Sequence, residues 1–376
     1  MAEEIKPVYA VASHIVSASG IGVDAHWNAV AEGRRGIAAY TEQGQQYYAG
    51  RLSYEQQEAI CNTIMNAQLS AFEKLCLFSA RAALAQCSND ICNGDTVVLL
   101  STTKGNIDRL NIQPDEQTLL SASASIIVKE LNIPTQPVVV SHACVSGAVA
   151  LLYAHRLLSS GRYKNAIVIG CDLFTPFVLD GFMSFHAIDA VPCRPFDAAR
   201  KGVNLGEAAA TIILSATTDT QPLAKLTGGA TSNDANHISG PSRTGEELAD
   251  AIGRAIAEAG IAASGIDMIS AHGTATVYND EMEARALHLS GLSNTPVHSM
   301  KSYTGHTLGA AGVLESAMII RAIQEQQLIP SAGYENHGVS VPVNVTIKMQ
   351  PATINYVLKT ASGFGGSNAA IVWAKP

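Results

Sequence analysis

Residues 137–150 read Pro-Val-Val-Val-Ser-His-Ala-Cys-Val-Ser-Gly-Ala-Val-Ala. The apolar run at 137–140 predicts a short buried strand, and the small residues from Ser146 onward predict a helix that begins directly behind Cys144. A thiol at a helix N-terminus lies near unpaired backbone N–H groups and the positive end of the helix dipole, which favour the reactive thiolate. The stretch therefore predicts a strand, a tight turn carrying a nucleophile, and a helix. Taken alone, a buried cysteine is more often a packing residue.

Three later segments combine histidines with small residues that allow the backbone to approach a ligand closely. Residues 271–276 read Ala-His-Gly-Thr-Ala-Thr, and residues 300–312 read Met-Lys-Ser-Tyr-Thr-Gly-His-Thr-Leu-Gly-Ala-Ala-Gly. Residues 362–368 read Ser-Gly-Phe-Gly-Gly-Ser-Asn, where glycines permit unusual backbone angles. Cys144, His272 and His306 are therefore the candidate residues for chemistry.

The composition limits the class of protein. The chain has 376 residues, 47% of them hydrophobic and 15% charged, which suits a large buried core. No apolar stretch reaches the roughly 18 residues that a membrane helix needs, and the N-terminus predicts no signal peptide. Seven cysteines without a Cys-x-x-Cys pair argue against a disulfide framework or a zinc site and favour a reducing cytoplasm. A net charge of −8 argues against a nucleic-acid partner.

Apolar, β-rich runs alternate with alanine- and leucine-rich helical patterns, which predicts an α/β fold. The helices expected at 146–159 and 309–325 begin with small residues and are apolar nearly all round, so they are expected to be buried. The other expected helices are 71–86 and 245–259. The expected strands are 8–16, 96–100, 136–140, 166–170, 209–214, 268–271, 343–349 and 369–373.

The Cys144, His272 and His306 motifs, with the Gly-Phe-Gly-Gly segment, resemble those of β-ketoacyl-acyl-carrier-protein synthases of the elongating, Cys-His-His type. The resemblance extends from about residue 97 to the C-terminus. It implies a thiolase-like α/β fold with two βαβαβαββ halves in a five-layer α-β-α-β-α arrangement. Residues 1–225 would form the half with the nucleophile, and residues 226–376 the half with both histidines.

The resemblance also implies roles for these residues. Cys144 would accept an acyl group from the phosphopantetheine of an acyl carrier protein, while His272 and His306 would stabilise the enolate formed from a malonyl thioester. Lys301 and Glu315 would support the histidines, or equally form a structural ion pair. No metal or cofactor of its own is implied, because the phosphopantetheine belongs to the carrier.

An oxyanion hole requires two backbone N–H groups, and those of Cys144 and Phe364 are the candidates. In the family the Phe364 side chain would also gate acyl entry; its alternative is a place in the core. Ala275 and Ser362 depart from the usual motifs, which puts loop motion and the shape of the acyl pocket in doubt. Residues 101–107 and the Ala-Cys-Val-Ser-Gly form look similar to synthases of aryl-polyene or flexirubin-type pigment clusters.

The expected partner is an acyl carrier protein, with no nucleic acid and no membrane span. Carrier proteins are acidic, so docking on this acidic chain would need a local basic patch. The candidates are Lys74 and Arg81, seven residues apart on one helix face, and Arg194, Arg200 and Lys201. A homodimer, or a heterodimer with a ketosynthase-like partner, is expected through the strand at 136–140.

The predicted function is decarboxylative Claisen condensation by a 3-oxoacyl-acyl-carrier-protein synthase of fatty-acid or polyene/polyketide biosynthesis. One alternative is a non-catalytic partner like a chain-length factor, although such subunits lack the nucleophile. Another is a thiolase-type acyltransferase on coenzyme A esters, which would need a second cysteine near the C-terminus, whereas the last cysteine here is Cys193.

Overall fold

The computed structural model describes residues 6–42, 44–87, 91–111, 116–217, 221–236 and 240–376. Ten strands form two groups of five with the same internal order and direction. The first group, in spatial order, is β6 (Val138–Val140), β5 (Thr96–Ser101), β7 (Asn165–Asp172), β9 (Ala208–Ser215) and β1 (Val8–Ser17). The second is β12 (Val297–His298), β11 (Met268–Ser270), β15 (Tyr356–Gly363), β16 (Ser367–Ala374) and β10 (Ala224–Asn233).

In each group three parallel strands are followed by two antiparallel ones, so the second half repeats the topology of the first. The two groups meet where β1 pairs with β10 from Val8↔Leu226 to Ala10↔Ala224. This repeat confirms the predicted α/β class and thiolase-like fold. The division between residues 225 and 226, near the start of β10, stays a prediction.

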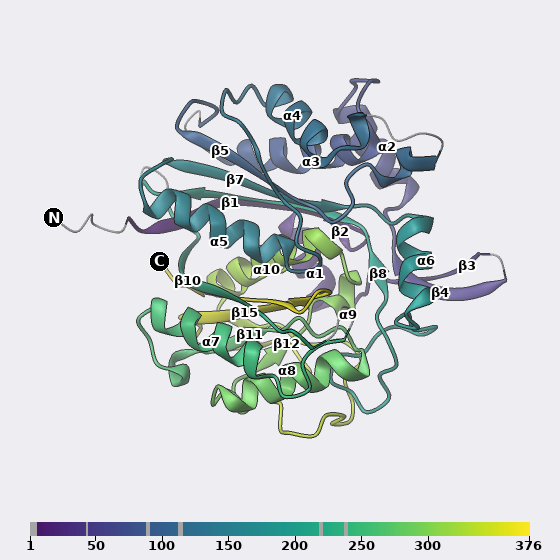
Figure 1. The fold of residues 1–376 in the computed structure, drawn as a ribbon, viewed down its shortest axis with the longest axis vertical. Coiled ribbons are helices and arrows are strands. Elements are labelled where there is room, and N and C mark those ends of the chain that lie inside the picture. Colours follow the sequence, from purple (N-terminus) through teal and green to yellow (C-terminus); the bar gives the residue numbers. More distant parts are fainter. Residues whose placement is uncertain (1–5, 43, 88–90, 112–115, 218–220, 237–239) are drawn as a thin grey trace.

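Helices separate and cover the two strand groups in five layers (Figure 1). The α3 and α4 helices cover the first group, α5 and α10 lie between the groups, and α7 and α8 cover the second. The helices are α1 (Val23–Ala31), α2 (Tyr54–Thr63), α3 (Ala71–Leu84), α4 (Leu120–Glu130), α5 (Ser146–Ser159), α6 (Pro176–Ser184), α7 (Glu246–Glu258), α8 (Val277–Leu289), α9 (Lys301–Thr304) and α10 (Ala311–Glu325).

Short strands complete the fold outside the two groups. They are β2 (Gly20–Ile21), β3 (Ala38–Glu42), β4 (Gln45–Gly50), β8 (Leu205–Gly206), β13 (Gln327–Leu328) and β14 (Gln350–Pro351). The β3 and β4 strands form an antiparallel hairpin that projects from the body beside α6 (Figure 1).

The central helices α5 and α10 cross at glycine. A Cβ added to Gly312 would lie 2.3 Å from the backbone nitrogen of Ala148, and one added to Gly147 would lie 2.9 Å from the Gly312 Cα. The small residues that begin both helices therefore let the backbones touch. This crossing places the N-termini of α5 and α10 side by side, and both lead back to predicted site residues.

The sequence-based strand assignment was wrong in one place and missed several strands, among them β3, β4 and two long strands of the second group. The segment at 343–349 is irregular apart from a single bridge, Val297↔Val345, although Val343 and Val345 are buried in the core. The alternation of hydrophobic residues therefore reflects burial of side chains and not pairing of the segment with a neighbouring strand. The missed β10 strand contains Gly228 and Gly229, where α7 and α5 pack closely on the sheet. The missed β15 strand contains a lysine, Lys359, which is fully buried.

Candidate active site

The turn before α5 is held in a strained conformation that presents Cys144. Ala143 has φ 46°, a left-handed value that costs a non-glycine residue about 1–2 kcal/mol. The Ser146 hydroxyl accepts the His142 N–H at 2.7 Å and donates to the Ala143 carbonyl at 2.6 Å. These two bonds fix the turn, so Cys144 lies at the wall of a cavity with a side chain that is almost entirely buried.

His272 is positioned by a carboxylate that the sequence analysis missed. It follows β11 after one residue, and Glu283 on α8 accepts the N–H groups of His272 and Gly273, each at 2.7 Å. Glu283 also accepts the Thr360 hydroxyl at 2.6 Å, which joins the loop to β15. The only sequence signal for Glu283 is its place on the helix that follows the 271–276 motif.

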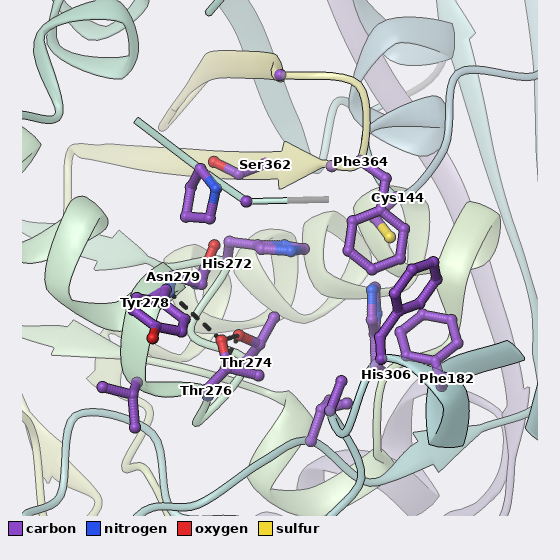
Figure 2. A pocket seen from close by; sticks show the side chains of 18 of the residues that line it. Cys144, Phe182, His272, Thr274, Thr276, Tyr278, Asn279, His306, Ser362 and Phe364 are labelled. Atoms are coloured by element: carbon purple, nitrogen blue, oxygen red, sulfur yellow. Dashed lines mark hydrogen bonds between the residues drawn. The ribbon is translucent and has the colours of Figure 1, made fainter. Parts of the chain in front are cut away.

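His306 lies across the cavity from His272. Its Nδ1 accepts the Leu308 N–H at 3.4 Å, so in the neutral ring the proton is on Nε2. The two imidazole rings lie 5.3 Å apart between centroids and are nearly perpendicular, at 85°. Figure 2 shows Cys144, His272 and His306 converging on one space from three different elements.

Both histidines are held neutral. The pKa of His272 is lowered well below 6.5, chiefly by burial, then by the positive charge of Lys301, with His306 and Lys359 adding to the effect. The pKa of His306 is lowered in the same way by burial, then Lys301 and Lys359. Neutral imidazoles that face a cavity can donate N–H bonds to an oxygen without adding charge to the resting site.

Cys144 behaves differently from the sequence-based expectation of a resting thiolate. Burial raises its pKa to about 11, more than the opposing effects of Lys301, Lys104 and the Phe364 N–H. Desolvation therefore outweighs the helix terminus, and the resting group at neutral pH is a thiol. If Cys144 acts as a nucleophile, its proton must leave in the same step in which the sulfur attacks.

Lys301 and Glu315 form an ion pair, and a second lysine, Lys359, contacts the same carboxylate. Lys301 Nζ lies 2.7 Å from Glu315 Oε1, and Lys359 Nζ lies 2.6 Å from Glu315 Oε2. Both lysines are fully buried, and Glu315 nearly so. The group lies behind the histidines, where its charge lowers their pKa values.

Phe364 lies at the mouth of the cavity. Its side chain is 36% exposed, which excludes the alternative of a core residue. Its ring packs on Phe182 and Phe185 of the α6 region, at 5.6 Å and 5.4 Å between centroids. Its backbone N–H forms a hydrogen bond with the Cys144 thiol. The residue therefore combines the two expected features, an N–H directed at the nucleophile and an aromatic ring over the entrance (Figure 2).

Glycine is required in the loop after Phe364. Gly365 and Gly366 have φ values of 86° and 77°, in the left-handed region that favours glycine. A Cβ on Gly366 would also lie 2.0 Å from the Asp234 carbonyl oxygen. The loop can therefore turn sharply enough to bring the Phe364 N–H and ring to the same cavity.

The cavity has a volume of about 470 Å³ and is open to solvent on one side. Apolar and aromatic side chains supply part of its wall, and hydroxyl and amide groups supply the rest. Residues lining it include Cys144, Phe182, Phe185, Lys201, Val203, His272, Thr274, Thr276, Asn279, His306, Ser362, Phe364 and Asn368. Its size suits an extended chain that carries a few polar groups.

A second buried carboxylate, Asp172, connects the two halves behind Cys144. It accepts the Thr102 hydroxyl at 2.8 Å, the Thr103 N–H at 2.9 Å and the Gly309 N–H at 2.7 Å. Thr102 and Thr103 follow β5, whereas Gly309 begins the turn into α10. Asp172 therefore fixes the turn into α10 at Gly309, three residues after His306, and nothing in its local sequence indicated this.

The predicted docking residues lie in different surroundings. Lys74 and Arg81 lie on α3, and Arg81 pairs with Glu130 at 3.1 Å. Lys201 is exposed and lines the cavity, and Arg194 faces Asp197 at 3.8 Å.

The prediction is wrong for Arg200, because this residue is buried. Its guanidinium donates to the carbonyls of Asp197, Gly338 and Val277 and lies 3.8 Å from Asp280. It joins its own loop in the first half to loops of the second half and offers no charge to a partner.

Other candidates for chemistry are not supported. Cys171, a second cysteine at the end of an apolar strand, is fully buried on β7 and does not line the cavity. Among the described residues, no group of three or more His, Cys, Asp or Glu side chains is arranged to hold a metal ion. No helix within the described ranges is long and apolar enough to span a membrane.

Comparison with known proteins agrees with this geometry. Residues 6–220 match the family model of the β-ketoacyl synthase N-terminal domain, and residues 223–335 match that of the C-terminal domain. A 3-oxoacyl-[acyl-carrier-protein] synthase 2 of Mycobacterium leprae is 31% identical over 246 residues, 61% of this chain and 59% of that protein. The aligned part thus spans less than two thirds of that relative's length.

Two further similarities extend over nearly the whole chain. A putative polyketide β-ketoacyl synthase 1 of Streptomyces cyaneus is 27% identical over 408 aligned positions, 96% of each chain. The solved structure of the ishigamide ketosynthase/chain length factor superimposes with a TM-score of 0.90 at 24% identity, covering 99% of each chain. At that identity the structural likeness shows the fold.

A duplicated α/β fold with a cysteine and two neutral histidines around one cavity has the features of a thiol-dependent acyltransferase. The family matches cover most of the sequence, and both halves of the fold are included in them. The chain belongs to the β-ketoacyl synthase family.

Proposed function

We propose that the chain is a 3-oxoacyl-acyl-carrier-protein synthase, which condenses an enzyme-bound acyl group with a malonyl-acyl-carrier protein and releases CO₂. The observation that carries the proposal is the convergence of Cys144, His272 and His306 on one cavity, with both imidazoles neutral. A nucleophile and two uncharged N–H donors are what an acyl transfer followed by a decarboxylation requires.

In the first step Cys144 attacks the carbonyl of an acyl thioester on the carrier. The Cys144 sulfur forms the new C–S bond, the phosphopantetheine sulfur leaves, and the thiol proton ends on that leaving group. The step is therefore balanced without an external base, which suits a thiol whose pKa is about 11. The Phe364 N–H, which contacts this sulfur, is one donor for the oxyanion, and the N–H of Cys144 is the other.

In the second step the malonyl carboxylate leaves as CO₂, and its electron pair forms an enolate on the thioester carbonyl. His272 and His306 would donate to that oxygen; the Nε2–H of His306 is available because Nδ1 is occupied by Leu308. The enolate carbon then attacks the acyl-Cys144 thioester, and the cysteine sulfur leaves as a thiolate. Taking up one proton restores the resting thiol.

The carrier protein would approach the open side of the cavity, where Lys201 is the exposed cation among the lining residues named above. The hydroxyls of Thr274 and Thr276, 2.9 Å apart, offer polar groups to the phosphopantetheine arm. No cofactor is proposed for the chain itself. Buried free thiols at Cys171 and Cys193 support a cytoplasmic, reducing location.

Dimerisation is proposed through β6, which ends the strand order of the first half and, within the described part of the chain, has one edge with no strand beside it. Val138 and Val139 are half-buried in the single chain, which suits an edge that another strand covers. The partner is either a second copy or a chain-length-factor-like subunit, as in the ishigamide ketosynthase/chain length factor. The pigment-type pathway, inferred from residues 101–107, remains part of the proposal.

The non-catalytic alternative is less well supported because Cys144 is present and lines the cavity with both histidines. The test is to incubate the protein with acyl- and malonyl-carrier proteins and to detect a 3-oxoacyl product two carbons longer by mass spectrometry. Cys144→Ala should abolish the product and the acyl-enzyme mass while leaving some CO₂ release. Elongation by Cys144→Ala would refute the site, and a wild-type protein inactive alone and with candidate partner subunits would refute the function.

A further inference from the structure

The site contains a buried lysine that the mechanism above does not use. Lys359 lies in the middle of β15, is fully buried, and brings its ammonium group to the carboxylate already paired with Lys301. Glu315 therefore contacts two lysines, at 2.7 Å and 2.6 Å. One carboxylate balances one positive charge, so this three-residue group carries an excess positive charge inside the protein.

The ammonium group of Lys359 also bridges two strands that lead to the cavity. It donates to the Ser270 carbonyl at 3.3 Å and to the Thr360 carbonyl. Ser270 ends β11, two residues before His272, and β15 continues from Thr360 to the Phe364 loop. Both segments that carry cavity residues in the second half are thus fastened to one side chain.

Two other ionisable groups lie around Lys359, one neutral and one negatively charged. His298 on β12 is buried with both ring nitrogens unpaired, and burial followed by Lys359 lowers its pKa to about 3, so it is neutral. The negative charge of Glu283 on α8 favours the charged form of Lys359, but its oxygens are engaged by two backbone N–H groups and the Thr360 hydroxyl and form no ion pair with the lysine. A buried charge is costly, so a second buried lysine on one carboxylate calls for an explanation.

We infer that Lys359 is a positioning residue of the condensation site: it fastens the end of β11 to β15 and supplies the second buried positive charge that keeps His272 and His306 neutral hydrogen-bond donors. The inference rests on the proposed function and adds a residue to it. Lys359 does not line the cavity, so it acts through the histidines and not on the substrate.

The direction of the histidine pKa values supports this role. Burial and Lys301 are the larger causes of the lowered pKa of both histidines, and Lys359 contributes in the same direction to each. Burial lowers the pKa of Lys359 as well, while its contact with Glu315 opposes that change and favours the charged form. Loss of this charge would therefore move the histidine pKa values up, toward 6.5.

The test is the pH dependence of CO₂ release from malonyl-carrier protein by wild type, Lys359→Met and Lys359→Gln. Neutral imidazole is the active form, so activity is lost as pH falls through the histidine pKa. Wild type should keep its activity well below pH 6.5. In both variants the acid limb of the pH profile should move up by about one pH unit, so at a given pH on that limb the rate should be about tenfold lower than in wild type. Near pH 8 the rates of the variants should lie within about twofold of the wild-type rate.

Lys348→Met, which removes an exposed lysine, is the matched control and should leave the profile unchanged. Lys359→Gln keeps an N–H donor for the Ser270 and Thr360 carbonyls, so it separates lost charge from a lost tether and should fold more readily than Lys359→Met. If neither variant folds, the wild-type profile still decides, because an acid limb near pH 6.5 would contradict the inference.

The outcomes also separate this inference from the proposed function. A wild-type protein that releases no CO₂ from any malonyl-carrier protein would refute the function and the role of Lys359 with it. An active wild type, with variants that slow equally at every pH or not at all, would refute only the role of Lys359. A merely structural lysine would lower the unfolding temperature without moving the acid limb.

Discussion

The crossing of α5 and α10 predicts that Gly312→Ala impairs catalysis from inside the core. The added Cβ would lie 2.3 Å from the Ala148 nitrogen and 2.7 Å from the Gly147 carbonyl carbon, whereas ordinary contact begins near 3.4 Å. All of these neighbours are helix backbone and cannot rotate away. The two helices must therefore separate locally by about 1 Å, the difference between 3.4 Å and 2.3 Å.

That displacement should lower both the folding free energy and the catalytic rate. Overpacking of a buried site typically costs about 1–3 kcal/mol of folding free energy. Cys144 lies two residues before α5, and His306 lies five residues before α10, so the separation moves the nucleophile relative to a donor. A misplacement of about 1 Å can lower a rate by about 100-fold. Condensation should therefore fall by about two orders of magnitude in protein that is still folded.

The assay is urea unfolding combined with single-turnover condensation of a pre-acylated enzyme. Gly253→Ala is the matched control, because Gly253 is an exposed helical glycine of α7 with nothing within 4 Å of an added Cβ. That substitution should stabilise the protein by about 0.5–1 kcal/mol and leave the rate unchanged. If Gly312→Ala behaves like Gly253→Ala, the close crossing does not set the geometry of the site.

Four other substitutions test separate parts of the site and of the predicted docking surface. His272→Ala or His306→Ala should lower CO₂ release by about 100-fold or more while acylation of Cys144 is partly retained, as acyl-enzyme mass would show; normal decarboxylation in both variants would contradict their assignment. Glu315→Gln should destabilise folding by about 3–5 kcal/mol in urea, because it leaves two buried lysines without a carboxylate, and a loss below about 1 kcal/mol would argue against one coupled group. Arg81→Glu should raise the KM for carrier-bound substrate at low salt but not for a small thioester, and unchanged kinetics would point to Lys201 instead.

The sequence was informative wherever local chemistry dictated local structure. The helix at 146–159 was predicted with the bounds that the structure has, because small residues after a tight turn leave little choice of conformation. The motifs around Cys144, His272, His306 and Phe364 singled out four residues that the structure brings to the lining of one cavity, while their catalytic roles stay predictions. The prediction of a strand at 343–349 was wrong because alternating burial does not require a neighbouring strand to pair with.

What the sequence by itself determined was the α/β class and, through the family motifs, the repeated arrangement; it also supplied the candidate residues of the site. Only the tertiary structure decided the pKa values of the site residues. Burial raises the pKa of Cys144 and lowers that of the histidines, and this depends on how much water the surrounding chain excludes. Residues such as Lys359 and Glu283 gain their roles from neighbours 44 to 77 positions away in sequence, through Glu315 and Thr360. Such contacts leave no local signal, because pairing across a fold depends on packing and not on spacing along the chain.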